Sequence, residues 1–406
     1  MILYEQYNRK VKMNISKYLL LTAITLLPLV SYSAGDYQML NQAVGLPFFN
    51  QDDDWKAAKL ETALRRSGII MRGSRQVRTA VLSRKIVLGV PAIEMKYVSN
   101  ASGDVTVIDI IYFNKGDSGK ARGLDSNIRN AARTLRKKLT ELAGKPESGK
   151  YGPKKMQNKV DIWKTESAEF LLEFVHGEFT ILHIRKPSND DGNATDNDMA
   201  SSTRGKDFSV NVKRNNFGDV AIYNIPMVDQ GNKGYCVPAT VERVFRYYGI
   251  TGVDMHRIAD AANTQRGGGT TIQAMLRAMA PLCREANLKE INCGEVNLSV
   301  IKKYIDRGIP LMWPMYVNQQ YEKIRLASQT SRQKAIFPEA WKKVIRRYRV
   351  PNTGVMHVCL IVGYNEITDE IGVSNSWGDR ELVPTWVPVK IARRVSQKST
   401  IVFLPR

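Results

Sequence analysis

A glycine-broken loop that turns into a helix, residues 229–240 (DQGNKGYCVPAT), constrains the chain most strongly. Pro238 suits a first helical turn, and apolar residues then recur at helical spacing as far as Tyr248, before Gly249. Cys236 is therefore predicted at a helix N-terminus, where the helix dipole and unpaired N–H groups favour a thiolate. A lone cysteine is more often a small buried hydrophobe, so this segment alone leaves both interpretations open.

Two further chemical groups follow in the C-terminal part of the chain. An apolar, β-rich run, residues 355–364, contains His357, and Asn375 follows after a turn. An imidazole can take the proton of a thiol, and an amide oxygen on its far nitrogen selects the tautomer. Gln230, six residues ahead of Cys236, carries an amide NH2 that can donate to a developing oxyanion. The four side chains together predict a thiol hydrolase.

These segments resemble the three active-site blocks of the papain-like cysteine peptidases: Gln-x5-Cys, a histidine strand ending in Gly-Tyr, and Asn-Ser-Trp-Gly. The Asp-Gln-Gly-x-Lys-Gly-Tyr-Cys form is similar to the bacterial branch related to bacteriocin-leader peptidases. The resemblance covers about residues 215–405 and implies an α+β catalytic domain, with a helical half carrying the cysteine and a β half carrying the histidine and asparagine. It implies an acyl-enzyme reaction with Cys236 as nucleophile, His357 as base, Asn375 as orienting residue, Gln230 as oxyanion donor and Trp377 as a shield.

Two positions depart from the family pattern. The leader peptidases usually carry aspartate at the third position, so Asn375 points to a papain-type triad and weakens the inference of a double-glycine leader substrate. Tyr235 and Val237 flank the cysteine where papain has serine and tryptophan, so the walls beside the nucleophile need not match.

Composition sets the broad class of the protein. The chain has 406 residues, 43% hydrophobic and 24% charged, which is enough for two ordinary domains. Its formal net charge of +21 favours acidic partners such as cell-wall polymer, a membrane surface or nucleic acid. No helix-turn-helix, zinc-finger or RNA-binding signature accompanies this charge, so nucleic acid is not an expected partner.

The start of the chain, residues 1–33, is predicted to be a signal peptide. An apolar run at residues 18–30 precedes small residues at a cleavage site, so the mature chain would begin at Ala34. Met13 makes a more conventional start than Met1. We therefore expect an exported protein, periplasmic or extracellular, without a membrane span after cleavage. An uncleaved N-terminal anchor is the alternative.

Three segments are expected after the signal peptide. Residues 34–187 predict a small α+β domain, 188–207 a flexible acidic linker, and 208–406 the peptidase domain. The first domain is a targeting module or an inhibitory pro-region, and the lack of an evident extended inhibitory peptide favours targeting. Its predicted elements are helices at 52–66 and 126–142 and strands at 86–98, 105–113, 160–163, 169–175 and 179–184.

The remaining cysteines and histidines indicate packing more than chemistry. Cys283 and Cys293 flank a short polar segment, residues 284–292, and the sequence leaves open whether they form a disulfide. Cys359 lies in an apolar run and is expected to be buried. No cysteine or histidine falls at metal-ligand spacing, so neither a metal nor another cofactor is expected. The histidines considered are His176, His183, His256 and His357.

The predicted peptidase domain contains helices at 254–262, 272–280 and 298–307 and a strand at 309–317. A basic insertion, residues 318–353, then separates this strand from the one bearing His357, so it should emerge near the active site. Four residues at helical spacing suggest that it packs on an apolar face: Trp341, Val344, Ile345 and Tyr348. Its cations either attract acidic substrates or simply keep an exposed helix soluble.

The sequence thus favours an exported thiol peptidase that acts on a protein or peptide. Two alternatives stay open: a cell-wall amidase or acyltransferase with the same triad, and a binding protein with an unproductive site. The sequence is silent on the substrate's side chains and on the oligomeric state.

Overall fold

The computed structural model describes residues 37–73, 77–116, 124–154, 156–187, 203, 205–250, 252–265, 269–378, 381 and 383–406. The predicted signal peptide and most of the predicted linker lie outside these residues. The chain divides into two compact units, Met1–Gly35 and Asp36–Arg406, and all the described residues belong to the second. That unit is a mixed α+β structure with two eight-stranded sheets in its described part. Across the same residues, no helix is long and apolar enough to span a bilayer.

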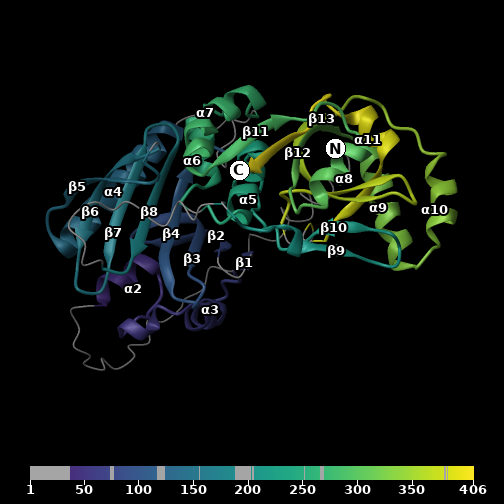
Figure 1. Ribbon diagram of the computed structural model, residues 1–406. Helices are drawn as coiled ribbons and strands as arrows, with labels where there is room; N and C mark the ends of the chain where they lie inside the picture. The colour runs from purple at the N-terminus through teal and green to yellow at the C-terminus, as the bar shows by residue number, and fades with distance from the viewer. Residues whose placement is uncertain are drawn as a thin grey trace, which may run out of the picture. The chain divides into compact units, whose positions relative to one another are not determined.

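The first sheet is antiparallel, with strand order β1-β2-β3-β4-β8-β7-β6-β5. Helix α4 lies along the sheet in Figure 1 and contacts β4, β6, β7 and β8, burying Leu135 and Leu139. The strands are β1 (Arg72–Gly73), β2 (Val77–Val87), β3 (Val90–Ser99), β4 (Val105–Asn114), β5 (Glu147–Tyr151), β6 (Asn158–Lys164), β7 (Glu169–Val175) and β8 (Phe179–Arg185). The helices of this part are α2 (Gln38–Val44), α3 (Ala57–Arg66) and α4 (Leu124–Ala143).

The strands predicted at 105–113, 160–163, 169–175 and 179–184 and the helix at 126–142 are confirmed, with small shifts at their ends. Two other predictions are only partly right. The strand predicted at 86–98 is β3 from residue 90 onward, but its first two residues belong to β2. Leu88 and Gly89 form the turn between the two strands, because both have positive φ, as a tight hairpin requires. The single helix at 52–66 breaks after Asp54, whose carboxylate accepts the backbone N–H groups of two preceding residues and so acts as a cap.

The second sheet is also antiparallel and has the order β11-β16-β12-β13-β10-β9, with β14 and β15 added beside β13. Its strands are β9 (Val212–Arg214), β10 (Val220–Ile222), β11 (Leu288–Asn292), β12 (Leu311–Val317), β13 (Val355–Asn365), β14 (Glu370–Ser374), β15 (Thr385–Pro388) and β16 (Ile401–Pro405). Its helices are α5 (Cys236–Tyr247), α6 (Met255–Ala261), α7 (Ile272–Glu285), α8 (Leu298–Ile305), α9 (Gln319–Gln333), α10 (Pro338–Ile345) and α11 (Val389–Val395).

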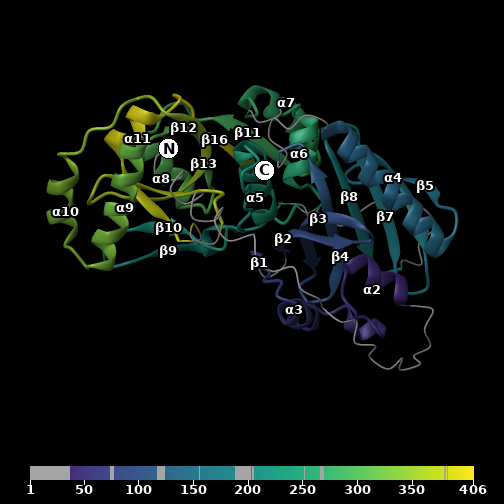
Figure 2. The same cartoon turned by 180° about the vertical axis from the view of Figure 1, so that it is seen from behind.

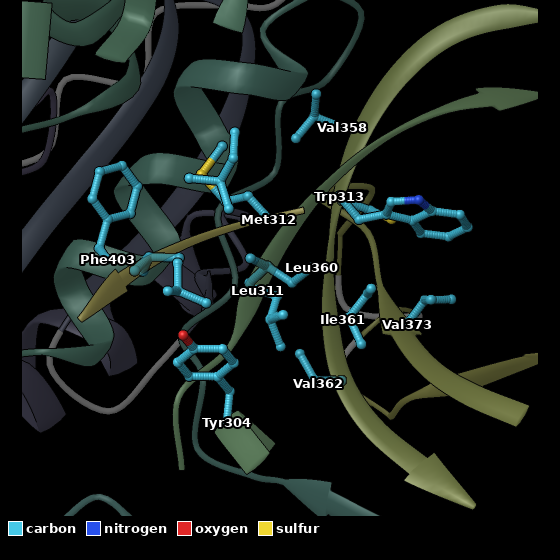
Figure 3. Packing of buried hydrophobic residues seen from close by; sticks show 14 of the residues in the cluster. Tyr304, Leu311, Met312, Trp313, Val358, Leu360, Ile361, Val362, Val373 and Phe403 are labelled. Atoms are coloured by element: carbon cyan, nitrogen blue, oxygen red, sulfur yellow. The ribbon is translucent and has the colours of Figure 1, made fainter. Parts of the chain in front are cut away.

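Strand β13 is the central element of this sheet. Every residue from His357 to Asn365 is buried, so both faces of the strand are covered. Figure 3 shows side chains of β12 and β13 gathered in the core with Phe403 of β16. Burying one such aliphatic side chain fully contributes about 1.5–3 kcal/mol, so the position of β13 is strongly determined by packing.

The segment between Cys283 and Cys293 differs from the predicted polar loop. Helix α7 continues through Cys283 to Glu285, and β11 then pairs with β16. The side chain of Cys283 packs into the hydrophobic core, and both cysteines are free thiols. A disulfide between them is therefore absent from the described structure.

Buried ion pairs join the first sheet to helix α6. Arg257 of α6 donates to Glu173 of β7 with 2.8 Å between Nη2 and Oε2. The same carboxylate lies 2.8 Å from Nε2 of His183, whose Nδ1 lies 2.7 Å from Asp109. Burial alone would lower the pKa of His183, but the two carboxylates raise it to about 9. The imidazolium form satisfies both partners.

A second buried cation extends these contacts. Lys96 of β3 reaches Asp109 at 2.7 Å and Asp254, the N-cap of α6, at 3.1 Å. The predicted division at a linker into two separate domains stays a prediction, but these contacts tie residues of both predicted domains together.

We predict that Arg257→Ala lowers the free energy of unfolding by about 3–5 kcal/mol, because it leaves Glu173 buried with less compensation. Lys164→Ala, which removes an exposed pair with Glu147 on the same sheet, is the matched control and should cost under about 1 kcal/mol. Urea denaturation measures both. Equal effects of the two variants would contradict a stabilising role for the buried pair.

Candidate active site

The predicted nucleophile lies where the sequence placed it. Cys236 is the first residue of α5, and the backbone N–H groups of Val358, Val237 and Cys236 itself reach its sulfur. Burial nevertheless raises the pKa of the Cys236 thiol above its usual value, with those N–H groups opposing the shift. Desolvation thus opposes the thiolate that the helix N-terminus favours.

The structure brings the predicted base and orienting residue together. His357 on β13 and Asn375, which follows β14, are both buried, with 3.1 Å between the imidazole Nε2 and the amide Oδ1. The Trp377 ring stacks on the imidazole, with 4.7 Å between ring centroids and 29° between planes. An Nε2–H donated to Asn375 leaves Nδ1 as an acceptor, which is the tautomer that a base next to a thiol requires.

Helix α5 is attached directly to the strand that carries the imidazole. Thr240, one turn after Cys236, donates from Oγ1 to the carbonyl of Val358 at 3.2 Å. Val358 is the residue after His357, and its N–H also reaches the Cys236 sulfur. Thiol and imidazole therefore come from two elements that are tied to each other at the site.

Arg243 of α5 supports the orienting asparagine from behind. It is buried and donates to the carbonyls of Asn375 at 2.8 Å and Ser374 at 3.2 Å, and to the Ser374 hydroxyl at 2.7 Å. Its Nε donates to the carbonyl of Pro226, ahead of the nucleophile loop. Burial lowers the pKa of Arg243 to about 10. One side chain thus connects α5, the end of β14 and the loop that leads to Gln230.

Gln230 is held with its amide nitrogen available for donation. Its Oε1 accepts the Ser376 hydroxyl at 2.7 Å, and its backbone N–H donates to the Ser376 carbonyl at 2.9 Å. Because the oxygen end is occupied, the NH2 end is the one left to point away from Ser376. This is the orientation that an oxyanion donor needs.

The nucleophile loop is also attached to the first sheet. Lys233 lies 3.3 Å from Glu94 of β3, and both side chains are buried. Gly116, which follows β4, approaches so closely that a Cβ atom there would lie 2.6 Å from the Lys233 Cβ. A larger residue at this glycine would displace the loop that carries Gln230 and Cys236.

Sequence reasoning missed Glu381 and Arg325. Glu381 is buried and its Oε2 accepts the Asn375 Nδ2–H at 2.9 Å. Arg325 of α9 binds that carboxylate, with 3.0 Å from Nη1 to Oε1 and 3.1 Å to Oε2. No motif in the sequence marks Glu381 as part of the site. Arg325 is one of many cations in the insertion, and the sequence does not distinguish it from the others.

The basic insertion packs onto the sheet more firmly than its charge suggests. Asn318 closes its neck by donating to the carbonyls of Pro351 and Thr353. Figures 1 and 2 show α9 and α10 beside each other, and α9 contacts β15. Arg332 is anchored by Asp219 at 2.7 Å and Glu370 at 3.0 Å.

The predicted apolar face of the insertion is partly confirmed. Trp341 and Ile345 of α10 are buried, and the Trp341 indole N–H donates to Glu370 at 3.1 Å. Tyr348 is half-buried, whereas Val344 is 42% exposed and does not belong to the packed face. The reason is that α10 is short and buries only one side against the sheet.

The imidazole is neutral in this environment. Burial lowers the pKa of His357 to about 4, opposed by the Asn375 hydrogen bond and the Glu381 charge, while Arg325 adds to the lowering. Thiol and imidazole are thus both uncharged near pH 7. The proton would move from sulfur to nitrogen only as the nucleophile attacks.

We predict that kcat/KM for a small peptide stays level from pH 7 to about 5 and falls as pH drops through about 4, because protonation removes the base. Alkylation of Cys236 by iodoacetamide should accelerate only on the alkaline side of pH 9. Rate profiles, with peptide mapping to identify the cysteine and circular dichroism to confirm folding, measure both. An acid limb near pH 6.5 would show an imidazole of ordinary pKa, and rapid alkylation at pH 6 would show a thiolate–imidazolium ion pair instead.

Residues 222–391 match the model of the Peptidase_C39 like family, whose members are papain-like cysteine peptidases related to bacteriocin-leader peptidases. No curated protein matches the chain.

Two solved structures are similar at low identity. One is the peptidase domain of Streptococcus ComA, a bifunctional ABC transporter involved in a quorum-sensing pathway, with 13% identity over 44% of this chain and 98% of that chain and a TM-score of 0.28. The other, described as a C39-like peptidase from Bacillus anthracis, has 14% identity over 46% and 98% of the two chains and a TM-score of 0.30. These TM-scores are too low to support a functional inference.

Proposed function

We propose that the protein is a thiol peptidase that hydrolyses peptide bonds through an acyl-enzyme intermediate. The observation that carries this proposal is the buried hydrogen bond between His357 and Asn375. The residue that follows His357 on β13, Val358, contacts Cys236. The match of residues 222–391 to the model of a peptidase family supports it. Because that family includes inactive members, turnover has to be measured.

The proposed reaction gives each of these side chains a defined role. The Cys236 sulfur attacks the peptide carbonyl carbon while His357 Nδ1 takes the thiol proton. The tetrahedral oxyanion accepts N–H groups from Gln230 and the helix N-terminus at Cys236. His357 then gives its proton to the leaving amine, which breaks the C–N bond and leaves a thioester. Water, deprotonated by the same imidazole, hydrolyses the thioester and regenerates the thiol.

The neutral state of the pair suits this order of steps. A thiol and an imidazole without charge require little solvation, so a buried site can hold them before substrate arrives. Charge then develops only when the oxyanion donors and the Asn375 oxygen are in place to stabilise it. Trp377 covers the imidazole on one face and limits competition by water for the His357–Asn375 hydrogen bond.

We predict that Cys236→Ala and His357→Ala abolish hydrolysis with the fold intact, because each removes half of the nucleophile pair. Asn375→Ala should leave weak activity, and Gln230→Ala should lower kcat on the order of a hundredfold. Steady-state kinetics on a peptide library and on purified cell wall measure the activity of each variant. The cell-wall substrate tests the amidase and acyltransferase alternatives. Retained turnover in Cys236→Ala or His357→Ala would reject the assignment. A wild-type protein that turns over neither substrate would favour a binding role.

Export to the periplasm or beyond stays part of the proposal on the strength of the sequence alone. The apolar run at 18–30 and the following small residues support cleavage before Ala34. Intact-mass measurement of the protein from the cell envelope or medium tests it. A mature chain that retains residues 1–33 in the cell would contradict export with cleavage.

We also propose that exposed cations on the insertion attract acidic substrates. Lys343, Arg346 and Arg347 are exposed, whereas Arg325 and Arg332 are used internally. Attraction of this kind is screened over about 8 Å at physiological salt, so it acts mainly on association.

We predict that changing Lys343, Arg346 and Arg347 together to Gln lowers kcat/KM for an acidic peptide several-fold at low salt and spares a neutral peptide. The control carries the same charge change on α4, at the exposed residues Arg133, Lys137 and Lys138. Equal losses in both variants, or no loss in either, would show that these cations only keep the surface soluble.

A further inference from the structure

We propose that Glu381 and Arg325 are positioning residues that select the working orientation of Asn375 and, through it, the tautomer of His357. The inference rests on the proposed peptidase function and adds two residues to its machinery. Glu381 lies outside every motif of the sequence, and Arg325 comes from the insertion between β12 and β13.

An asparagine in a triad has a weakness that an aspartate lacks. Its terminal amide has two ends of similar shape, and only the oxygen end can accept the imidazole Nε2–H. If the amide rotated by half a turn, its NH2 group would face Nε2 and would favour the tautomer with the proton on Nδ1. That tautomer cannot take a proton from the thiol, and a triad in the wrong tautomer loses on the order of 10⁴ in kcat.

Glu381 removes this ambiguity. Its carboxylate Oε2 lies 2.9 Å from Nδ2 of Asn375, while Oδ1 of the same amide faces Nε2 of His357 at 3.1 Å. A carboxylate can only accept hydrogen bonds, so it holds the NH2 end and turns the oxygen end toward the imidazole. Glu381 and Asn375 are both buried, so water does not offer an alternative partner at low energy.

Arg325 keeps the Glu381 carboxylate ionised, so that it can only accept hydrogen bonds, and holds it in position. Its guanidinium binds both oxygens of Glu381, donates to Thr385 Oγ1 at 3.1 Å, and lies 5.7 Å from the centre of the Trp377 ring. Trp377 in turn stacks on His357. The insertion therefore supports the imidazole along two routes, one through hydrogen bonds and one through the indole.

The same charges bear on the developing imidazolium. The charged groups that act on His357 are Glu381, which raises its pKa, and Arg325, which lowers it. Asn375 and Glu381 thus share the two tasks of a single aspartate. The amide oxygen selects the tautomer, and the carboxylate behind it stabilises positive charge at longer range.

The first test is Glu381→Gln, which keeps the shape and removes the charge and the pure acceptor. We expect kcat to fall about 10–100-fold with KM within about twofold, because binding surfaces are untouched. The acid limb of the pH profile should move to lower pH in this variant and to higher pH in Arg325→Met. Opposite shifts distinguish an electrostatic effect on His357 from structural damage.

The second test exchanges the two groups. Asn375→Asp alone places two carboxylates in contact and should be poorly active. Asn375→Asp combined with Glu381→Gln restores one donor and one acceptor between the two positions, so it should recover at least tenfold over Asn375→Asp alone. If the double variant instead shows the product of the activity losses of the two single variants, the proposal is overturned.

Matched controls come from the same helix. Arg332→Met removes the insertion's other anchored arginine, which binds Asp219 and Glu370 but none of the triad. It should lower stability without moving the acid limb. Glu322→Gln removes a carboxylate that binds Arg325 but not Asn375, and should leave kcat close to wild type.

A readout without substrate separates this inference from the peptidase proposal. The chain has four histidines, so 15N spectra of labelled protein, with His357→Ala for assignment, can report the His357 tautomer. We expect Nε2–H in the wild type and a mixture of tautomers in Glu381→Gln. A wild-type tautomer that survives Glu381→Gln would overturn the positioning role even if peptides are cleaved. The expected change in a protein that cleaves nothing would reject only the peptidase proposal.

Discussion

The hydrogen bond between His357 and Asn375 is the interaction on which the proposed chemistry depends. It is buried, so the surroundings have to supply every partner that water would otherwise provide. Arg243 holds the backbone of Asn375, Glu381 holds its amide nitrogen, and Trp377 covers the imidazole. Together these side chains keep this one contact in a single geometry.

The same requirement explains how distant segments are used. Helix α5 supplies Cys236 at its start and Thr240 and Arg243 further along, so one helix positions the thiol and contacts the strands of the base and its partner. The insertion carries one arginine to Glu381 and another to Glu370. A segment that looks like a surface appendage by charge is therefore bound into the catalytic part of the fold.

The sequence predicted the parts of the site whose signals are local. A cysteine before Pro238 and an apolar helical period predict the start of α5, and the β-rich run around His357 predicts β13. Features that depend on tertiary contacts could not be predicted from the sequence. The ionisation of Cys236 depends on its burial, which only the folded chain creates. The roles of Glu381 and Arg325 depend on contact between segments far apart in the chain. The turn at Leu88 depends on a positive φ at a residue other than glycine, which the sequence does not indicate.

Trapping the acyl-enzyme tests the central claim most directly. The protein is mixed with a substrate in stoichiometric amount, quenched in acid within one turnover, digested and analysed by mass spectrometry. The account predicts an acyl adduct on the peptide that contains Cys236, which accumulates in Gln230→Ala if thioester hydrolysis becomes the slow step, and is absent in Cys236→Ala. Product formed at an undiminished rate in Cys236→Ala, without an adduct at this residue, would contradict it.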